Sequence, residues 1–181
     1  EVTGNRKYSD LAAYFINERG QSPNYFETVE HCEDTENLQA DRPIREMQKL
    51  RGHSVRALYY LSGAADVAAE SGDSSLFEAC ERLWNNVVER NMYITGGVGS
   101  TCVGEAFTAD YNLPNDTAYA ESCASIALVL FADRMLNQTG DARYADVMET
   151  ALYNGAISGL SLGGDKFFYA NPLENDDQMF E

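Results

Sequence analysis

Apolar residues recur along much of the chain at intervals of three and four. This spacing occurs in residues 5–16, 73–87 and 141–152, and each of these segments also carries polar residues on its opposite face. A single apolar stripe with a polar back is typical of a helix that packs against a core by one side. The three segments are therefore predicted to be outer helices.

Two further segments have a different pattern. Residues 53–70 and 118–137 are rich in Ala, Leu and Ser and contain few charges, and residues 126–132 are apolar without interruption. A helix that is apolar on every side is buried by neighbours all round it. These two segments are therefore predicted to be inner helices.

Short turn sequences separate the helices at a constant interval. The tripeptides TGN at 3–5, SGD at 71–73 and TGD at 139–141 stand 68 residues apart. Glycine suits the position just after a helix, and Asn or Asp suits the residue that caps the next one. Each tripeptide is therefore predicted to be a tight turn between two helices of a hairpin.

Outer and inner helices that alternate at a long fixed period are typical of an (α/α)6 toroid, in which each hairpin is covered by its neighbours. We predict an all-α fold in which residues 1–181 form part of a single domain, as an incomplete toroid of two and a half hairpins. The long connections at 20–52 and 92–117 are where function is expected. The aromatic segment 166–173 predicts a short β-strand near the C-terminus, leaving the helical layer at Pro172.

The chain is strongly acidic. Thirteen Lys and Arg against 29 Asp and Glu give a formal net charge of -16. This charge repels nucleic acid and anionic membranes, whereas a neutral sugar incurs no such penalty. The longest apolar run is too short for a membrane span, and the chain starts without a methionine or a signal peptide, so we expect a fragment of a longer protein.

The repeat aligns two titratable residues. His53 and Glu121 lie 68 residues apart, and each one opens a predicted inner helix. Both side chains should therefore face the same rim of the ring, where titratable groups could form a pocket. The alternative is that each side chain only caps its own helix.

A glycine-rich stretch, YITGGVGSTCVGEAFT at 93–108, precedes the second inner helix. It matches neither the dinucleotide-binding nor the P-loop phosphate pattern, because a cysteine stands where a third glycine is needed and no lysine follows. Its glycines could instead bring the backbone close to a ligand and point Glu105 into a cleft as a general acid. An ordinary solvated glutamate is the alternative.

Glu121 and Cys123 carry two side-chain types that bind zinc. In a regular helix, side chains two residues apart point about 200° away from each other, so the pair could share an ion only where the backbone is not yet helical. Two ligands are too few for a zinc site. The four cysteines match no CxxC metal or disulfide pattern, and reduced, mostly buried thiols are the alternative.

Six ordered blocks resemble the β-L-arabinofuranosidases of glycoside hydrolase family 127 and its relative, family 146. The resemblance extends from about residue 38 to residue 174. The blocks are GHSVRALY at 52–59, MYITGGVG at 92–99, GEAFT at 104–108, LPNDTAYAESCA at 113–124, RYADVMETALYNG at 143–155 and FFYANPL at 167–173.

The resemblance implies an (α/α)6 catalytic domain, followed in such enzymes by β-sandwich domains that this chain lacks. It also implies a retaining glycosidase whose nucleophile is a zinc-bound cysteine thiolate. By motif, Glu105 matches the general acid/base, and Glu121 and Cys123 match two zinc ligands. His53 and Tyr169 match residues of the sugar subsite. The nucleophile and the other ligand would be adjacent cysteines beyond the last residue, so the 181 residues alone are expected to be inactive.

Two alternatives remain at this stage. Another (α/α)6 carbohydrate enzyme, such as a sugar epimerase or an unsaturated glucuronyl hydrolase, would not need a thiolate-bound metal. A non-catalytic helical scaffold that binds glycans would be unaffected by the loss of Glu105. A metal-bound thiolate slightly favours a reducing cytoplasm.

Overall fold

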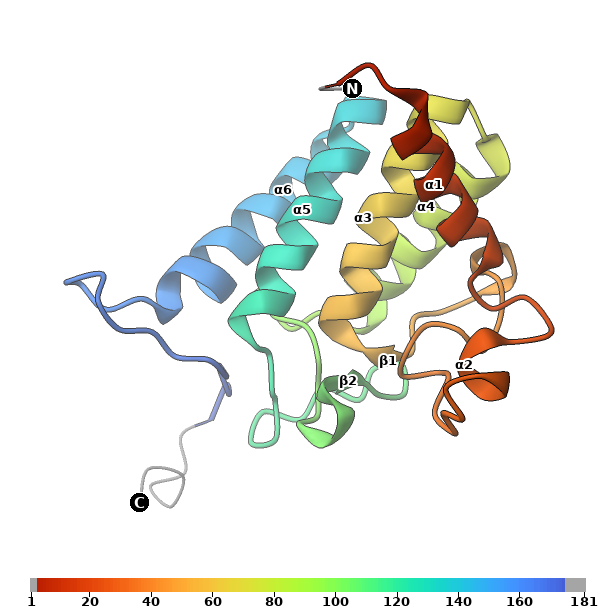
Figure 1. Cartoon of the computed structure of the whole chain (residues 1–181). Coiled ribbons are helices and arrows are strands. Elements are labelled where there is room, and N and C mark those ends of the chain that lie inside the picture. Colours follow the sequence, from red (N-terminus) through yellow and green to blue (C-terminus); the bar gives the residue numbers. More distant parts are fainter. Residues whose placement is uncertain (1–2, 175–181) are drawn as a thin grey trace.

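The computed structural model describes residues 3–174, and this part of the chain is mostly helical. Long helices α3 and α5 lie side by side, α1 and α4 pack against α3, and α6 packs against α5 (Figure 1). The arrangement confirms the predicted helical hairpins. The helices are α1 (Arg6–Glu18), the short α2 (Tyr25–Thr28), α3 (Ser54–Ser71), α4 (Ser74–Arg90), α5 (Ser122–Thr139) and α6 (Ala142–Ala151).

The predicted turns have the expected backbone. Gly72 and Gly140 end α3 and α5 in the left-handed conformation, with φ angles of 69° and 68°. Asp73 and Asp141 then accept a hydrogen bond from a main-chain amide in the first turn of α4 and α6, and Asn5 does the same for α1. The caps satisfy amides that have no partner inside the helix.

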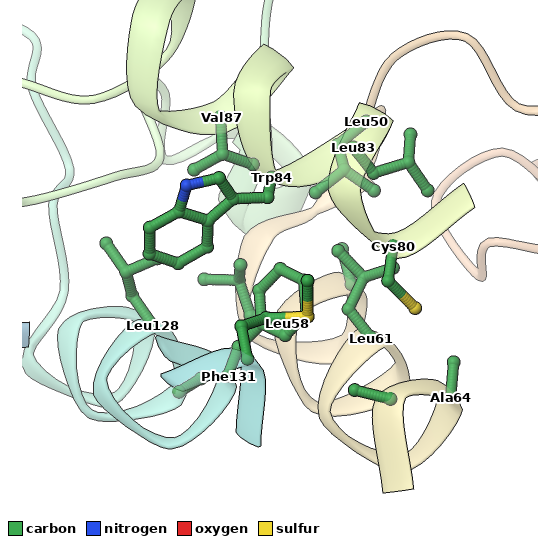
Figure 2. Packing of buried hydrophobic residues seen from close by; sticks show 14 of the residues in the cluster. Leu50, Leu58, Leu61, Ala64, Cys80, Leu83, Trp84, Val87, Leu128 and Phe131 are labelled. Atoms are coloured by element: carbon green, nitrogen blue, oxygen red, sulfur yellow. The ribbon is translucent and has the colours of Figure 1, made fainter. Parts of the chain in front are cut away.

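The core lies among α3, α4, α5 and α6. Trp84 of α4 is its centre, with ring centroids 5.5 Å from Phe131 of α5 and 4.7 Å from Tyr144 of α6. Figure 2 shows Trp84 above Leu128 and Phe131, with Leu58 of α3 beside them. The outer helix α4 covers this core by one apolar face, as its pattern predicts. The inner helices are not buried all round within residues 3–174, since Tyr59 of α3 and Ile126 of α5 are 46% and 44% exposed.

Helix α1 differs from the other outer helices. Its apolar residues Tyr8 and Phe15 are 62% and 61% exposed, and only Ile16 of this helix is buried. The positions one repeat later, Leu76 and Leu83 of α4, are fully buried. Helix α1 packs against α3, and most of its apolar stripe is left exposed among the described residues.

Two expectations about the connections need correction. Residues 118–121 are not helical, so α5 begins at Ser122, four residues later than predicted. The predicted strand at 166–173 is reduced to a single antiparallel bridge between Leu160 and Phe167. Its main-chain carbonyls instead accept hydrogen bonds from the start of α5, which leaves little of the segment free to pair as a strand.

The regular sheet in the described residues is a pair of short strands that the sequence did not predict. Strand β1 (Gly52–His53) pairs antiparallel with β2 (Ala106–Phe107). The 3₁₀ turns Ile44–Glu46, Val103–Glu105 and Ile157–Gly159 and the π-helical turn Leu152–Ala156 complete the elements. Within residues 3–174, no helix is long and apolar enough to cross a membrane.

The cap at Asp73 provides a test of the hairpin turn. Hydrogen bonds from Ser75 and from the Leu76 amide, with Arg45 nearby, lower the pKa of Asp73 from its ordinary 3.8 to about 2. Asp73→Ala is expected to lower the free energy of unfolding of the protein by about 1 kcal/mol, as for other helix N-caps.

This contribution should depend on pH in a defined direction. Because folding lowers the pKa of Asp73, its stabilisation is complete above about pH 4 and is lost as the pH falls to about 2. Urea unfolding of the protein and of Asp73→Ala should differ at about pH 7 and converge near pH 2. An equal difference at both pH values would contradict the role of the ionised cap.

Candidate active site

The candidate site lies at the end of the bundle where α3 and α5 begin. Strands β1 and β2 lie at this end, and so does the loop that links α4 to α5 (Figure 1). The strand pairing places His53 opposite Ala106, the residue that follows Glu105. The two long connections predicted to carry function therefore meet through this short sheet.

His53 makes two different interactions. As the N-cap of α3, its Nδ1 accepts the main-chain N–H of Arg56 at 3.5 Å. Its Nε2 lies 2.8 Å from Oε2 of Glu105, and the side chain is 12% exposed. Because Nδ1 acts as an acceptor, the proton of a neutral ring lies on Nε2 and points at Glu105. His53 therefore both caps its helix and takes part in the rim cluster.

The end of the glycine-rich loop holds Glu105 in an unusual backbone conformation. Gly104 and Glu105 have φ angles of 68° and 52°, and a positive φ is uncommon for a residue with a side chain. The Ser54 hydroxyl donates to the main-chain carbonyl of Glu105 at 3.1 Å, and the Glu105 amide donates to the carbonyl of Cys102. Backbone strain of this kind concentrates at functional sites. The loop is a mount for this carboxylate.

The glycines upstream allow the loop to pack closely. A Cβ atom on Gly96 would lie 2.8 Å from the backbone of Ala151 in α6. A Cβ atom on Gly99 would lie 2.9 Å from the hydroxyl of Ser54, the side chain that holds the Glu105 carbonyl. The glycines thus bring the loop against the start of α3 and the end of α6, and they serve packing in place of phosphate binding.

Tyr119 is a site residue that the sequence reasoning missed. Its hydroxyl donates to Oε1 of Glu105 at 3.1 Å. Partial burial and this hydrogen bond raise the pKa of Tyr119 to about 12. The signal that could have found Tyr119 is its position two residues before Glu121, within the block LPNDTAYAESCA at 113–124 that carries part of the family resemblance.

Tyr169 joins the two parts of the cluster. Its ring packs edge-on against Tyr119, with centroids 6.1 Å apart. Its hydroxyl lies 3.6 Å from Sγ of Cys123, and its carbonyl accepts the Ser122 amide at the start of α5. The segment that forms no strand therefore places the phenol of Tyr169 beside the thiol of Cys123 and its ring against Tyr119, the residue that contacts Glu105.

Glu121 and Cys123 face each other because α5 begins between them. Glu121 is the N-cap residue, with extended backbone angles of -66° and 149°, and its side chain makes no capping hydrogen bond. The Cys123 thiol donates to Oε1 of Glu121 at 3.0 Å. The condition that the backbone not yet be helical at Glu121 is therefore met, and the capping alternative is wrong for Glu121.

The surroundings of this pair are unusual for a protein interior. Glu121 is fully buried, and its Oε2 atom has no hydrogen-bond partner in the described part of the chain. Burial and the hydrogen bond with Glu121 raise the pKa of the Cys123 thiol. A buried carboxylate without a partner is costly unless a cation or a proton balances it. Within residues 3–174, no group of three or more His, Cys, Asp and Glu is placed to hold a metal ion.

The fold and the cluster together define a class of protein. A helical-hairpin domain brings an imidazole, two carboxylates, a thiol and two phenols to the end where its two inner helices begin. Most glycoside-cleaving enzymes use a pair of Asp or Glu carboxyl groups, so a cluster that holds two carboxylates is compatible with this class.

Comparison with known proteins identifies the family. The model of the GH127 catalytic domain of β-L-arabinofuranosidases matches residues 1–180. The chain therefore belongs to the GH127 β-L-arabinofuranosidase family, which is a family of glycosidases. Of the two related families that the sequence resembles, family 127 is the one matched.

Individual relatives agree with this assignment. The chain is 42% identical over 186 residues to the non-reducing end β-L-arabinofuranosidase of Bifidobacterium longum subsp. longum, and the match covers 96% of the chain and 28% of that protein. A crystal structure of a GH127 β-L-arabinofuranosidase from Geobacillus stearothermophilus T6 superimposes with a TM-score of 0.95 at 53% identity, covering 99% of the chain and 30% of the other. A further GH127 β-arabinofuranosidase structure superimposes with a TM-score of 0.88 at 45% identity, covering 97% and 26%. The chain thus spans less than a third of the length of these relatives.

Proposed function

We propose that the full-length protein is a retaining β-L-arabinofuranosidase and that residues 1–181 supply its general acid/base and half of a zinc site. The observation that carries this proposal is the strained placement of Glu105, whose two carboxylate oxygens meet His53 and Tyr119. Membership of the GH127 family supports the reaction class. It also favours a glycosidase over the epimerase, glucuronyl hydrolase and scaffold alternatives.

Glu105 would act first as an acid and then as a base. Its side chain is 37% exposed, so a substrate oxygen can reach the carboxyl group. In the first step the protonated carboxyl would donate to the glycosidic oxygen while the nucleophile bonds to the anomeric carbon, so that the alcohol leaves. In the second step the carboxylate would remove a proton from water, which bonds to the anomeric carbon and displaces the nucleophile. The backbone geometry supports this role, because the positive φ of Glu105 and the hydrogen bonds of its main chain fix the position of the residue.

His53 and Tyr169 would bind the sugar. Each offers a polar atom beside the acid or the thiol, and each is partly accessible. A neutral arabinoside also suits an acidic protein, because no phosphate or carboxylate of the ligand opposes the net charge of -16. The family supports an arabinofuranoside as the substrate class, and the names of the relatives support a β-linkage.

The residues present fit zinc as part of a ligand set. Oε2 of buried Glu121 has no hydrogen-bond partner in the described part of the chain, and Oε1 of the same carboxylate lies 3.0 Å from Sγ of Cys123. Carboxylate oxygen and cysteine sulfur are both zinc ligands. Bound zinc would keep cysteine sulfur in the thiolate form at neutral pH, where it is a good nucleophile. By resemblance, two adjacent cysteines outside the 181 residues complete the ligand set, and one of them is the nucleophile.

An assay of the full-length protein tests the reaction and its stereochemistry. Purified protein should hydrolyse β-L-arabinofuranosides and leave α-L-arabinofuranosides intact. Proton NMR recorded during the first minutes of hydrolysis should detect the β-anomer of arabinose before it equilibrates, because a double displacement retains configuration. An initial α-anomer, or no hydrolysis of the β-linked substrate, would reject the proposal.

A further inference from the structure

We propose that Tyr119 is a positioning residue that acts through Glu105, by occupying Oε1 so that the catalytic proton is carried by Oε2. This inference rests on the proposed role of Glu105 as the acid. It assigns separate tasks to the two oxygens of one carboxyl group. Only an acid with its proton on the oxygen that faces the glycosidic bond can protonate the leaving group.

The two oxygens have different partners. The Tyr119 hydroxyl donates to Oε1 at 3.1 Å, and Nε2 of His53 lies 2.8 Å from Oε2. Within residues 3–174, Oε1 of Glu105 is the acceptor for the Tyr119 hydroxyl. A proton on Oε1 would point at this O–H, so the hydroxyl would have to give up Oε1 as its acceptor before the proton could occupy that oxygen. The hydrogen bond therefore disfavours Oε1 as the site of the proton.

The backbone around Tyr119 is held on both sides. The Ala120 amide donates to the carbonyl of Gly99 at 2.8 Å, and the Asn171 amide donates to the carbonyl of Tyr119 at 3.1 Å. Ala120 itself has a φ of 36°, a conformation that such a network has to enforce. The ring then rests edge-on against Tyr169. Tyr119 is thus attached to the glycine-rich loop that carries Glu105 and to the C-terminal segment.

The partner of Oε2 is the one that a substrate can replace. With Nδ1 occupied by the Arg56 amide, the N–H of His53 is on Nε2 and points at Oε2. A proton on Oε2 would point at this N–H. Protonation of Oε2 therefore requires the N–H of His53 to donate to another acceptor. A sugar hydroxyl is such an acceptor. Substrate binding by His53 would therefore free Oε2 for the proton while Tyr119 keeps Oε1 in place.

The test compares two leaving groups in the full-length protein carrying Tyr119→Phe, which keeps the ring and removes the hydroxyl. Hydrolysis of a β-L-arabinofuranoside with an alkyl leaving group needs the acid, and its kcat should fall about 10- to 100-fold, a part of the roughly 10²- to 10⁴-fold that general acid catalysis contributes. The kcat for a nitrophenyl leaving group, which departs without a proton, should change little. KM should stay the same for both substrates. An equal loss on both substrates would overturn the proposal.

Tyr93→Phe is the matched control. Tyr93 is a buried tyrosine of the same connection, and its hydroxyl donates to the carbonyl of Pro114 at 3.0 Å. This variant also loses one phenol hydrogen bond, but it should not separate the two leaving groups. If it separated them as Tyr119→Phe does, the effect would come from the loop and not from Oε1, and the proposal would fail.

A double variant distinguishes this inference from the proposed function. If Tyr119 acts through Glu105, Tyr119→Phe should cause no further loss in kcat once Glu105 is already glutamine. Additive losses would overturn the inference and leave the role of Glu105 intact. If Glu105→Gln itself left hydrolysis of the alkyl substrate unchanged, the proposed function would fail first.

Discussion

Glu105→Gln in the full-length protein is expected to lower kcat for an alkyl β-L-arabinofuranoside by about 10²- to 10⁴-fold, the usual contribution of a general acid. Glutamine has nearly the same shape and can still accept the hydrogen bond from Tyr119. Its amide group has no acidic proton that it could transfer to the leaving group. The folded structure should therefore be kept while the acid is lost. Steady-state kinetics on alkyl and nitrophenyl substrates measure the effect.

The same variant should affect the two substrates through different steps. Loss of the acid slows the departure of the alkyl group. The nitrophenyl group leaves without a proton, so the overall rate for that substrate is limited by the second step, the base-assisted attack of water. A pre-steady-state burst of nitrophenol should therefore be seen with Glu105→Gln. Glu89→Gln, on the exposed outer face of α4, is the control with the same chemical change. Similar kinetics for the two variants would remove Glu105 from the mechanism.

The repeat made much of the fold predictable. A turn that needs a left-handed residue followed by a cap has a short sequence signature. The tripeptide at 71–73 and its two copies therefore predicted where each hairpin turns and which positions of successive hairpins are equivalent. The repeat also placed His53 and Glu121 at equivalent positions, and both are N-cap residues in the structure. Local backbone chemistry determines these features, and local chemistry can be read from a sequence.

The contacts within the cluster could not be predicted in the same way. The bond between His53 and Glu105 depends on strand pairing between connections more than 50 residues apart, and the bond from Tyr119 depends on a positive φ at Ala120. Neither feature has a period or a turn signature. The strand predicted at 166–173 failed for a related reason, because its main chain serves the start of α5. Tertiary contacts override local propensity in such segments.

The start of α5 shows how these two levels combine. Sequence spacing alone argued against a shared ion at Glu121 and Cys123, because regular helical geometry separates the side chains. The helix begins only at Ser122, and a main-chain bond from the Ser122 amide to the carbonyl of Tyr169 accompanies that boundary. Because the helix starts four residues later than predicted, the oxygen of Glu121 and the sulfur of Cys123 lie next to each other despite their unfavourable spacing in the sequence.

Cys123→Ser in the full-length protein is expected to lower zinc affinity by at least about 100-fold, since loss of an outer-shell partner of a metal ligand already costs about 10- to 100-fold. A serine hydroxyl does not ionise at neutral pH and is a poor replacement for a thiolate. Glu121→Gln should act in the same direction, because its buried Oε2 would lose the negative charge that the cation needs. Zinc per protein, measured by elemental analysis after dialysis against a weak chelator, reports the loss independently of activity.

Cys32→Ser separates loss of a ligand from loss of any thiol. Cys32 is a half-buried thiol in the connection that follows α2, and its substitution should leave the zinc content unchanged. Full zinc in Cys123→Ser would show that the pair at the start of α5 holds no metal. Loss of zinc from both Cys123→Ser and Glu121→Gln, with full zinc in Cys32→Ser, would assign the buried oxygen and the neighbouring sulfur to one ion. Only an ion that both side chains bind gives the substitutions at 121 and 123 the same effect.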